Sequence, residues 1–183
     1  MVSTVEKLIT LLNIPKSDSQ RSLQIMNETD LAHLKRSVAL AKEALEAGDE
    51  PFGSVLVDAK GNVCMEDRNR VAGGDHTRHP EFEIARWAAN NMTPEQRAGA
   101  TVYTSGEHCP MCAAAHAWVG LGRIMYVSSS AQLTSWLSEL KMTKSPVNPL
   151  PIEAVAPNVA VYGPVPALVE QVHALHRQFH QAD

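Results

Sequence analysis

The chain has 183 residues, a length suited to one domain with a buried core. Its composition is that of a globular protein, with 44% hydrophobic and 20% charged residues, and 16 basic against 20 acidic residues give a net charge of −4. This balance argues against a dedicated nucleic-acid-binding protein. We also expect no membrane span, because no apolar run reaches the length that one requires.

The N-terminal part is expected to differ from the rest. Residues 2–12 mix apolar and polar side chains in a helical pattern, which predicts a short amphipathic helix rather than a signal peptide. Residues 13–27 are polar and predict a linker. We therefore expect two parts: a helix and linker over residues 1–27, and one domain over residues 28–183.

The chain has three cysteines, of which two form a C-x-x-C pair. An odd number with one such pair does not fit a disulfide framework. Free thiols suit a reducing compartment, so we expect a cytoplasmic protein.

Helical and strand patterns alternate from residue 28 onward. Thr29 or Asp30 can cap a first helix that runs to about Ala47, before Gly48. Stretches rich in apolar and β-branched residues predict five strands, over residues 52–57, 63–66, 100–104, 123–128 and 158–162. Further helices are predicted over residues 80–91, 109–120, 131–140 and 164–180. Four prolines exclude regular structure from residues 143–157.

The order of these elements predicts a fold class. A helix separates the fourth and fifth strands, so these two strands are expected to be parallel, joined by a right-handed crossover. We therefore expect an α/β protein, a three-layer α/β/α domain with a mixed five-stranded sheet in which strands 4 and 5 are parallel.

Two short motifs contain the residues with metal-binding chemistry. Cys109 and Cys112 are three residues apart at the predicted start of a helix, where free backbone N–H groups stabilise thiolates. His79, thirty positions upstream, also stands at a predicted helix start. Two sulfurs and an imidazole suit Zn²⁺, and a catalytic zinc site has three protein ligands and a fourth position for water. Glu81 is placed to move protons on and off that water without binding the metal.

The same residues also occur in two other kinds of site. The C-x-x-C pair also occurs as a thioredoxin-like redox motif, although that motif needs no His-x-Glu partner. A structural zinc would require a fourth protein ligand, for which His76 and His108 are candidates. Cys64 is expected to be a small core residue. A packed or solvated helix face, rather than a second metal site, is expected for three histidines at helical spacing, His173, His176 and His180.

The pattern His79-Pro80-Glu81 followed by Cys109-Pro110-Met111-Cys112 resembles the cytidine deaminase-like superfamily of zinc-dependent base, nucleoside and nucleotide deaminases. The resemblance covers about residues 31–162. It implies that His79, Cys109 and Cys112 bind zinc and that Glu81 is the catalytic proton shuttle. The implied reaction is hydrolytic deamination of a small heterocyclic amine, with release of ammonia, in a protein that forms homodimers.

Local motifs are most similar to guanine deaminases, in the branch that also holds tRNA adenosine deaminases and cytosine deaminases. This similarity implies that Asn69 bonds the substrate and that Phe52 or Trp118 borders its ring, although core packing is an equally open role for Trp118. His108 stands where the family usually has proline, and it could bond a substrate.

The substrate class is expected to be a free nucleobase or nucleoside, guanine-like or cytosine-like. Similar guanine deaminases have an acidic residue shortly after the fourth strand, whereas this chain has hydroxyls and an amide over residues 128–132, which could recognise a different heterocycle. A tRNA adenosine deaminase is a second hypothesis, disfavoured because basic residues such as Lys141 and Lys144 are sparse. A third hypothesis is a zinc-binding protein of this fold without turnover.

Overall fold

The structure is a computed structural model, and it describes residues 26–143 and 145–181. The helix and linker expected before residue 26 lie outside the described residues. One five-stranded sheet has the order β2-β1-β3-β4-β5. Its strands are β1 (Gly53–Val57), β2 (Val63–Arg68), β3 (Thr101–Gly106), β4 (Arg123–Ser128) and β5 (Val161–Tyr162).

The directions of the strands confirm the predicted mixed sheet. β1 runs antiparallel to both β2 and β3, whereas β3, β4 and β5 are parallel to one another. The helices between and around them are α3 (Glu28–Glu46), α4 (Pro80–Asn91), α5 (Pro94–Gly99), α6 (Pro110–Trp118), α7 (Ser130–Glu139), α8 (Ile152–Val155) and α9 (Pro166–His180), with a 3₁₀ turn η1 (Val71–Gly73).

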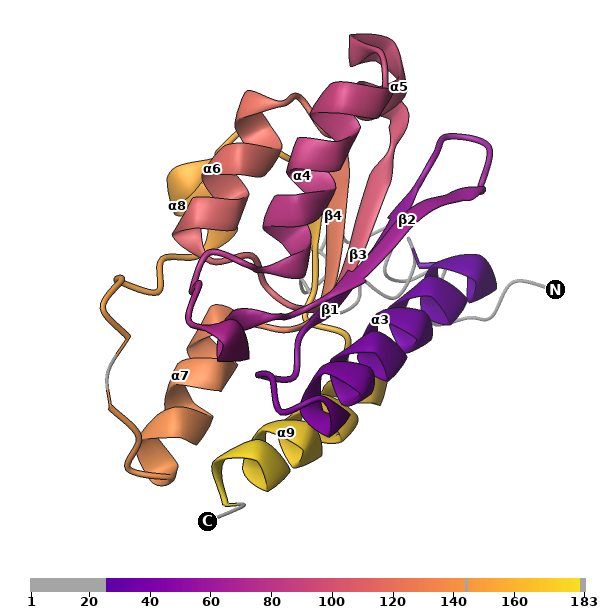
Figure 1. Cartoon of the computed structure of the whole chain (residues 1–183). Helices are drawn as coiled ribbons and strands as arrows, with labels where there is room; N and C mark the ends of the chain where they lie inside the picture. The colour runs from indigo at the N-terminus through magenta and orange to yellow at the C-terminus, as the bar shows by residue number, and fades with distance from the viewer. Residues whose placement is uncertain (1–25, 144, 182–183) are drawn as a thin grey trace, which may run out of the picture.

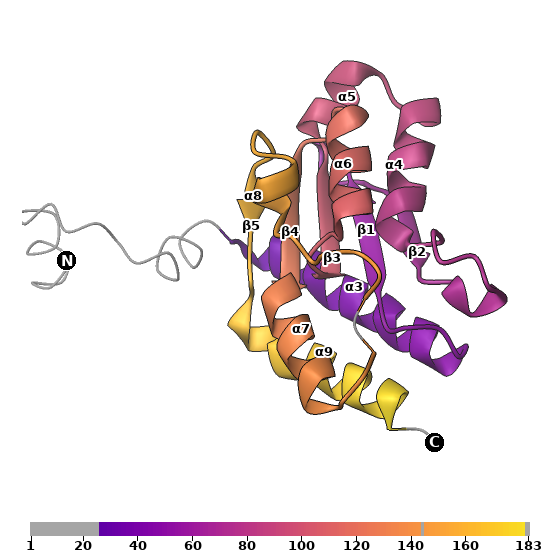
Figure 2. The same cartoon turned by 90° about the vertical axis from the view of Figure 1, so that its left-hand side faces the viewer.

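The helices cover both faces of the sheet, as Figures 1 and 2 show. Alternate residues of each strand point to opposite faces. Val55, Tyr103 and Val127 face the layer that contains α3 and α9, whereas Leu56 and Val102 face α4. The α6 and α8 side of the same layer is closed by a third apolar cluster, formed by Ala113, Ile124, Tyr126, Ile152 and Ala156. The predicted three-layer α/β/α architecture is therefore confirmed.

A glycine allows α3 to approach the sheet closely. A Cβ atom at Gly53 would lie 2.4 Å from Leu40 Cβ and 2.5 Å from the Ser37 carbonyl oxygen, both on α3. No larger residue fits there unless the helix moves. The first residue of β1 is thereby held against α3.

Three sequence predictions about local structure need correction. The cap of α3 is Asn27, not Thr29 or Asp30, because the Asn27 side chain and the Asp30 side chain form a capping box. Residues 94–99 form α5, for which no helix was predicted although Thr93 and Gln96 form a capping box there. Residues 152–155 form α8 inside the segment expected to be irregular, because no proline follows Pro151 until residue 157.

A buried polar network joins α3 to the sheet. Asp30 is 1% exposed, and its Oδ1 accepts hydrogen bonds from Tyr103 Oη at 2.6 Å and from Arg123 Nη2 at 2.8 Å. Replacing Asp30 by alanine would leave the Tyr103 hydroxyl without its acceptor and remove the α3 capping box. We expect Asp30→Ala to lower the free energy of unfolding by about 3 kcal/mol, measured by urea denaturation.

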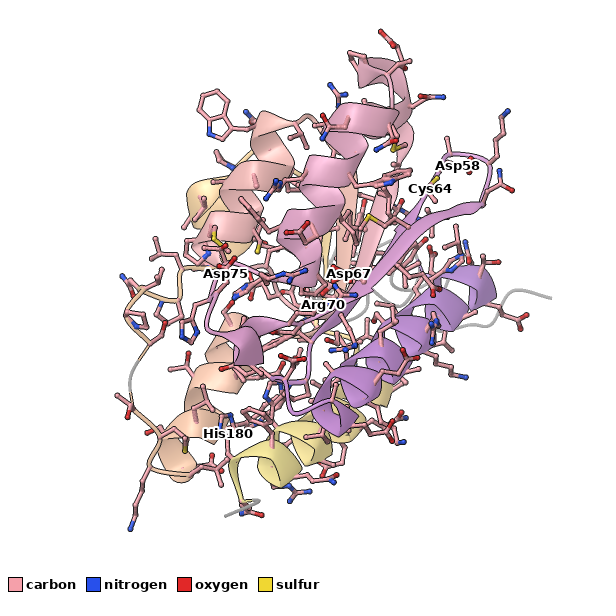
Figure 3. The ribbon with its side chains drawn as sticks, in the orientation of Figure 1. Asp58, Cys64, Asp67, Arg70, Asp75 and His180 are labelled. Carbon is pink, nitrogen blue, oxygen red and sulfur yellow. The ribbon has the colours of Figure 1, made fainter. Side chains whose placement is uncertain are left out.

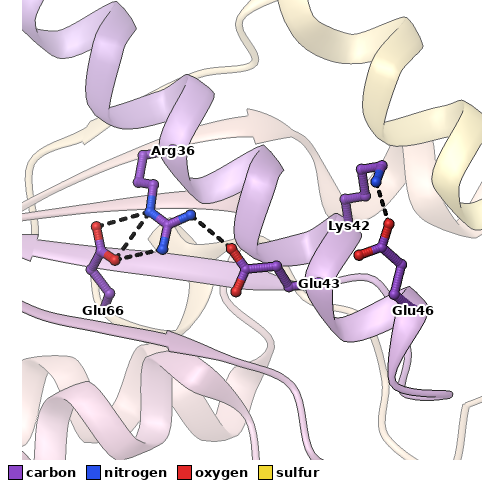
Figure 4. A network of polar contacts seen from close by, with 5 residues as sticks. All are labelled: Arg36, Lys42, Glu43, Glu46 and Glu66. Carbon is purple, nitrogen blue, oxygen red and sulfur yellow. Dashed lines mark hydrogen bonds and ion pairs between the residues drawn. The ribbon is translucent and has the colours of Figure 1, made fainter.

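A surface ion network on the same helix provides the control. Arg36 on α3 pairs with Glu66 of β2 at 2.7 Å and with Glu43 at 2.8 Å (Figure 4). These side chains are 31–49% exposed, so solvent screens both ion pairs and weakens them. Glu43→Ala also removes one carboxylate from α3, and it should cost less than about 1 kcal/mol. Equal losses in the two variants would contradict the role assigned to Asp30.

Described residues 26–143 and 145–181 include no helix that is both long enough and apolar enough to cross a membrane.

Candidate metal centre

Three donor atoms meet where α4 and α6 begin. His79 is the N-cap residue of α4, Cys109 is the N-cap residue of α6, and Cys112 lies in the first turn of α6. The Cys109 and Cys112 sulfurs are 3.5 Å apart, and each lies 3.6 Å from His79 Nδ1. The topology explains the meeting, because α6 starts at the carboxyl end of β3 and α4 packs beside α6.

The spacing of these atoms fits a tetrahedral zinc ion. With Zn–S near 2.3 Å and Zn–N near 2.0–2.1 Å, tetrahedral angles place two sulfurs about 3.8 Å apart and a sulfur about 3.6 Å from a nitrogen. Among the described residues, the possible ligands that gather within 4.8 Å of one another are His79, Cys109 and Cys112. This set includes neither His76 nor His108, so residues of the described part of the chain provide three of the four positions of a tetrahedral site.

Glu81 is buried beside the three donors. It is 5% exposed, and its Oε1 accepts hydrogen bonds from Ser54 Oγ at 3.0 Å and Thr104 Oγ1 at 2.8 Å. Its other oxygen, Oε2, lies 3.8 Å from Cys112 Sγ. Strands β1 and β3 therefore hold one carboxylate oxygen and leave the second directed at the donor group. Burial raises the pKa of Glu81 above its usual value, which favours a carboxyl group that can take up and return a proton.

The two thiols differ in acidity. The hydrogen bond from Cys112 lowers the pKa of Cys109 to about 4, and the same bond together with burial raises the pKa of Cys112. Hydrogen bonding to the Cys109 sulfur raises the pKa of His79 to about 9. A negative charge is thus already favoured on the Cys109 sulfur, as binding of a cation requires.

Two of the predicted substrate contacts lie at the same edge of the sheet. Asn69 follows β2 and is fully buried; its Oδ1 accepts from the Val71 amide at 2.9 Å, and its Nδ2 has no partner among the described residues. The backbone N–H of Asn69 donates to the backbone carbonyl of Phe52. The half-buried ring of Phe52 approaches Gly106, the last residue of β3, which precedes the loop that contains Cys109.

The structure does not bring Trp118 to this place, whereas His108 directly precedes the donor Cys109, and neither of its ring nitrogens has a partner among the described residues. Trp118 is 89% exposed at the far end of α6 from the cysteines. His108 is buried with its ring centroid 5.4 Å from that of His116, on the buried side of α6. Three of the polar groups after β4 are engaged within the fold: the Ser129 hydroxyl and the Gln132 carbonyl oxygen form the capping box of α7, and the Ser128 hydroxyl donates to the Ser105 carbonyl.

Figure 3 shows where several polar residues outside the donor set lie in the fold. Arg70 and Asp75 lie on the loop that leads into α4, and His180 lies near the end of α9. Cys64 lies beside Asp58 at the β1–β2 hairpin, well away from His180. Cys64 is half-buried at the margin of the α4-side core, so it is less enclosed than the core residue that we expected.

Sequence reasoning missed several residues around the donors. Ser54 and Thr104 hold Glu81. The visible signal was the single hydroxyl of Ser54 in an otherwise apolar β1, whereas β3 has several hydroxyl residues and did not single out Thr104. His176, expected on a packed or solvated helix face, is 2% exposed and contacts Phe52 edge-to-face at 5.0 Å between ring centroids. Neither of its ring nitrogens has a partner in the described part of the chain.

The burial of His176 predicts an acid-sensitive contribution to stability. Burial, with His180 and His173 nearby, lowers the pKa of His176 from 6.5 to about 3. Below pH 6.5 the unfolded chain therefore gains a proton that the folded chain does not take up until about pH 3. The free energy of unfolding therefore falls as the pH decreases from 6.5 towards 3. Between pH 7 and pH 5 this imidazole should account for about 2 kcal/mol of the decrease, and we expect His176→Phe to abolish that part.

This prediction is tested by urea unfolding of both proteins at the two pH values. The exposed His76 serves as the matched position, and His76→Phe should retain the pH dependence of the original protein. If His176→Phe retained it as well, the buried imidazole would not be the titrating group.

The fold and the donor set together define a mixed α/β/α protein with a Cys₂His donor set that could hold a metal ion. The chain matches the profile of the cytidine and deoxycytidylate deaminase zinc-binding region over residues 27–128. It belongs to this family, as the sequence motifs predicted.

Curated relatives match part of the chain. A probable cytosine deaminase of Schizosaccharomyces pombe is 36% identical over 108 residues, which are 59% of this chain and 65% of the relative. The guanine deaminase of Bacillus subtilis is 37% identical over 97 residues, 52% of this chain and 62% of the relative. The matches thus span a little less than two thirds of these relatives.

Solved structures share the fold. The guanine deaminase from Bacillus subtilis has a TM-score of 0.52 at 28% identity, covering 72% of this chain and 91% of that one. A guanine deaminase from Nitrosomonas europaea has a TM-score of 0.62 at 17% identity, covering 86% of each chain.

Proposed function

We propose that this protein is a zinc-dependent hydrolase that removes an exocyclic amino group from a small heterocycle. Water supplies the oxygen that replaces nitrogen at the ring carbon, and the amine leaves as ammonia. The observation that supports this most strongly is a buried carboxylate oxygen, Glu81 Oε2, 3.8 Å from a sulfur of a Cys₂His donor set. A redox pair or a four-ligand structural zinc site does not require a carboxylate there.

His79, Cys109 and Cys112 would hold the zinc ion, which when bound supplies a Lewis acid that lowers the pKa of a water molecule. Because Ser54 and Thr104 hold Oε1, Glu81 would exchange protons through Oε2. It would take one proton from the attacking water, pass it to the ring nitrogen and assist the departure of ammonia.

The substrate that we propose is a free nucleobase or nucleoside, guanine-like or cytosine-like. The unpartnered Nδ2 of Asn69 can donate a hydrogen bond to a carbonyl or ring nitrogen, and the half-buried ring of Phe52 can border a planar heterocycle. Relatives named cytosine deaminase and guanine deaminase support the same class.

A tRNA adenosine deaminase is a second candidate, because a relative of that name in Haemophilus influenzae is 30% identical over 107 residues. The net charge of −4 disfavours it, since a macromolecular polyanion requires a basic surface.

The deciding experiment measures zinc content and then ammonia release from a panel of substrates. The panel contains guanine, cytosine, adenine, cytidine, deoxycytidine, adenosine and an unmodified tRNA. Ammonia from one small molecule, at one zinc per chain, would support the proposal. Turnover of the tRNA alone would favour the second candidate, and zinc without ammonia from any member would favour a protein of this fold that does not turn over.

We also propose a homodimer in a reducing, cytoplasmic environment. All three cysteines are free thiols, which suits that compartment. Trp118 and Ala117 are exposed on the outer side of α6, where a second copy could cover them. Light scattering should give a mass twice that of one chain. Trp118→Ser should lower the measured mass towards that of a single chain, because it removes an apolar contact between the two copies.

A further inference from the structure

Glu107 connects the cysteine loop to two other segments of the chain. It lies between β3 and Cys109, and its side chain is half-buried. Its Oε2 accepts a hydrogen bond from the Ser130 amide at 2.7 Å, and its Oε1 accepts one from the Ile152 amide at 2.9 Å. Both carboxylate oxygens thus bind backbone N–H groups that begin helices, groups that have no acceptor inside their own helices.

These two amides fix the segment that follows β4. Ser130 is the first residue of α7, and Ile152 is the first residue of α8. Ile152 is fully buried beside Ala113 of α6, so its position is set by the core. By accepting from both amides, the Glu107 side chain holds the start of α7 at a constant distance from the buried Ile152.

The position of α7 affects the edge where Phe52 lies. Trp136 of α7 stacks on His173 of α9 at 4.4 Å and lies 6.1 Å from the ring of His176. His176 in turn contacts Phe52 at 5.0 Å. These rings form a continuous aromatic group from α7 to Phe52, which we call the aromatic wall: Phe52, Trp136, His173 and His176.

We propose that Glu107 is a positioning residue that holds the aromatic wall in place for substrate binding, an inference that rests on the proposed function. The loop before Cys109 is held independently of the Glu107 side chain, because the Glu107 backbone N–H donates to the Ser128 carbonyl at 2.8 Å. Changing the side chain should therefore affect substrate affinity more than zinc binding or the chemical step.

The test compares Glu107→Gln with Glu153→Gln. The glutamine at 107 keeps the length of the side chain but replaces one acceptor oxygen by an NH₂ group, which cannot accept from a backbone N–H. Glu153, in the first turn of α8, is exposed and is not hydrogen-bonded to either amide in the described structure, so its variant makes the same charge change as a control. In hydrogen exchange by mass spectrometry of the zinc-loaded protein, only Glu107→Gln should accelerate exchange around residues 130–134 and 152–156.

Kinetics give the second readout. We expect Glu107→Gln to keep one zinc per chain and to raise KM roughly tenfold with kcat changed less than about threefold. The aspartate in Glu107→Asp is one methylene shorter, so we expect it to reach at most one of the two amides and to give an intermediate KM. It serves as the main variant if the glutamine variant does not fold. Unchanged exchange, an unchanged KM, or a loss of kcat and zinc in place of a higher KM would overturn the inference. Failure of the proposed function would differ, because the unaltered protein itself would then release no ammonia.

Discussion

Replacing Glu81 by glutamine is expected to abolish ammonia release and to leave one zinc per chain. The glutamine carbonyl can still accept from Ser54 and Thr104, so the fold around residue 81 should persist. The amide cannot take a proton from water or return one to the substrate. Positioned acid–base groups typically contribute about 10²–10⁴-fold to rate, and two transfers through one residue place the expected loss near the upper end. Initial rates of ammonia release and metal analysis of the same samples measure both outcomes.

The control for this variant lies on the same helix. Glu83→Gln removes one carboxylate from the first turn of α4, where Glu83 pairs only loosely with Arg86 at 3.9 Å. It should retain both zinc and activity. Glu81 would not be the proton shuttle if its glutamine variant stayed active, and it would have a role in binding metal if zinc were lost.

Replacing His79 by alanine is expected to remove the metal and much of the stability together. Zinc that binds only the folded chain stabilises it by about 4 kcal/mol when free zinc is 1,000 times its dissociation constant. For a domain of this size, a loss of that order lowers Tm by roughly 10 °C. The measurements are zinc content and thermal unfolding with and without a chelator.

Two comparisons make this result specific. The chelator should lower the Tm of the unaltered protein to near that of His79→Ala, and it should have little effect on the variant. His76→Ala removes an exposed imidazole three residues earlier and should change neither zinc content nor Tm. A variant at position 79 that still held one zinc per chain would contradict the proposed ligand set.

Local sequence patterns predicted the elements around the site well. The predicted bounds of the helix over residues 80–91 and of the strand over residues 123–128 agree with α4 and β4. Both elements have clear signals, an initial proline in one and a run of apolar residues in the other. α8 was missed because it is a single turn among prolines, where its burial against α6 decides the conformation.

The site was predictable to the extent that its chemistry lies in short motifs. His79, Glu81, Cys109 and Cys112 occupy two helix starts, and their residue types, together with the family pattern that they resemble, predicted that the donors would meet. Their roles stay predictions until metal and turnover are measured. Trp118 shows the limit of this reasoning. Similarity to guanine deaminases implied that it could border the substrate ring, but the direction of α6 places it at the end opposite to the cysteines, exposed to solvent.

The sequence by itself determined the fold class, the donor set and the family, because each depends on residue type and on spacing within one or two elements. The tertiary structure decided what surrounds them. Ser54 and Thr104 come from different strands to hold Glu81, and Glu107 reaches amides 23 and 45 residues further along the chain. Such contacts depend on how the sheet pairs and where each helix packs, and no local pattern of side chains encodes that arrangement.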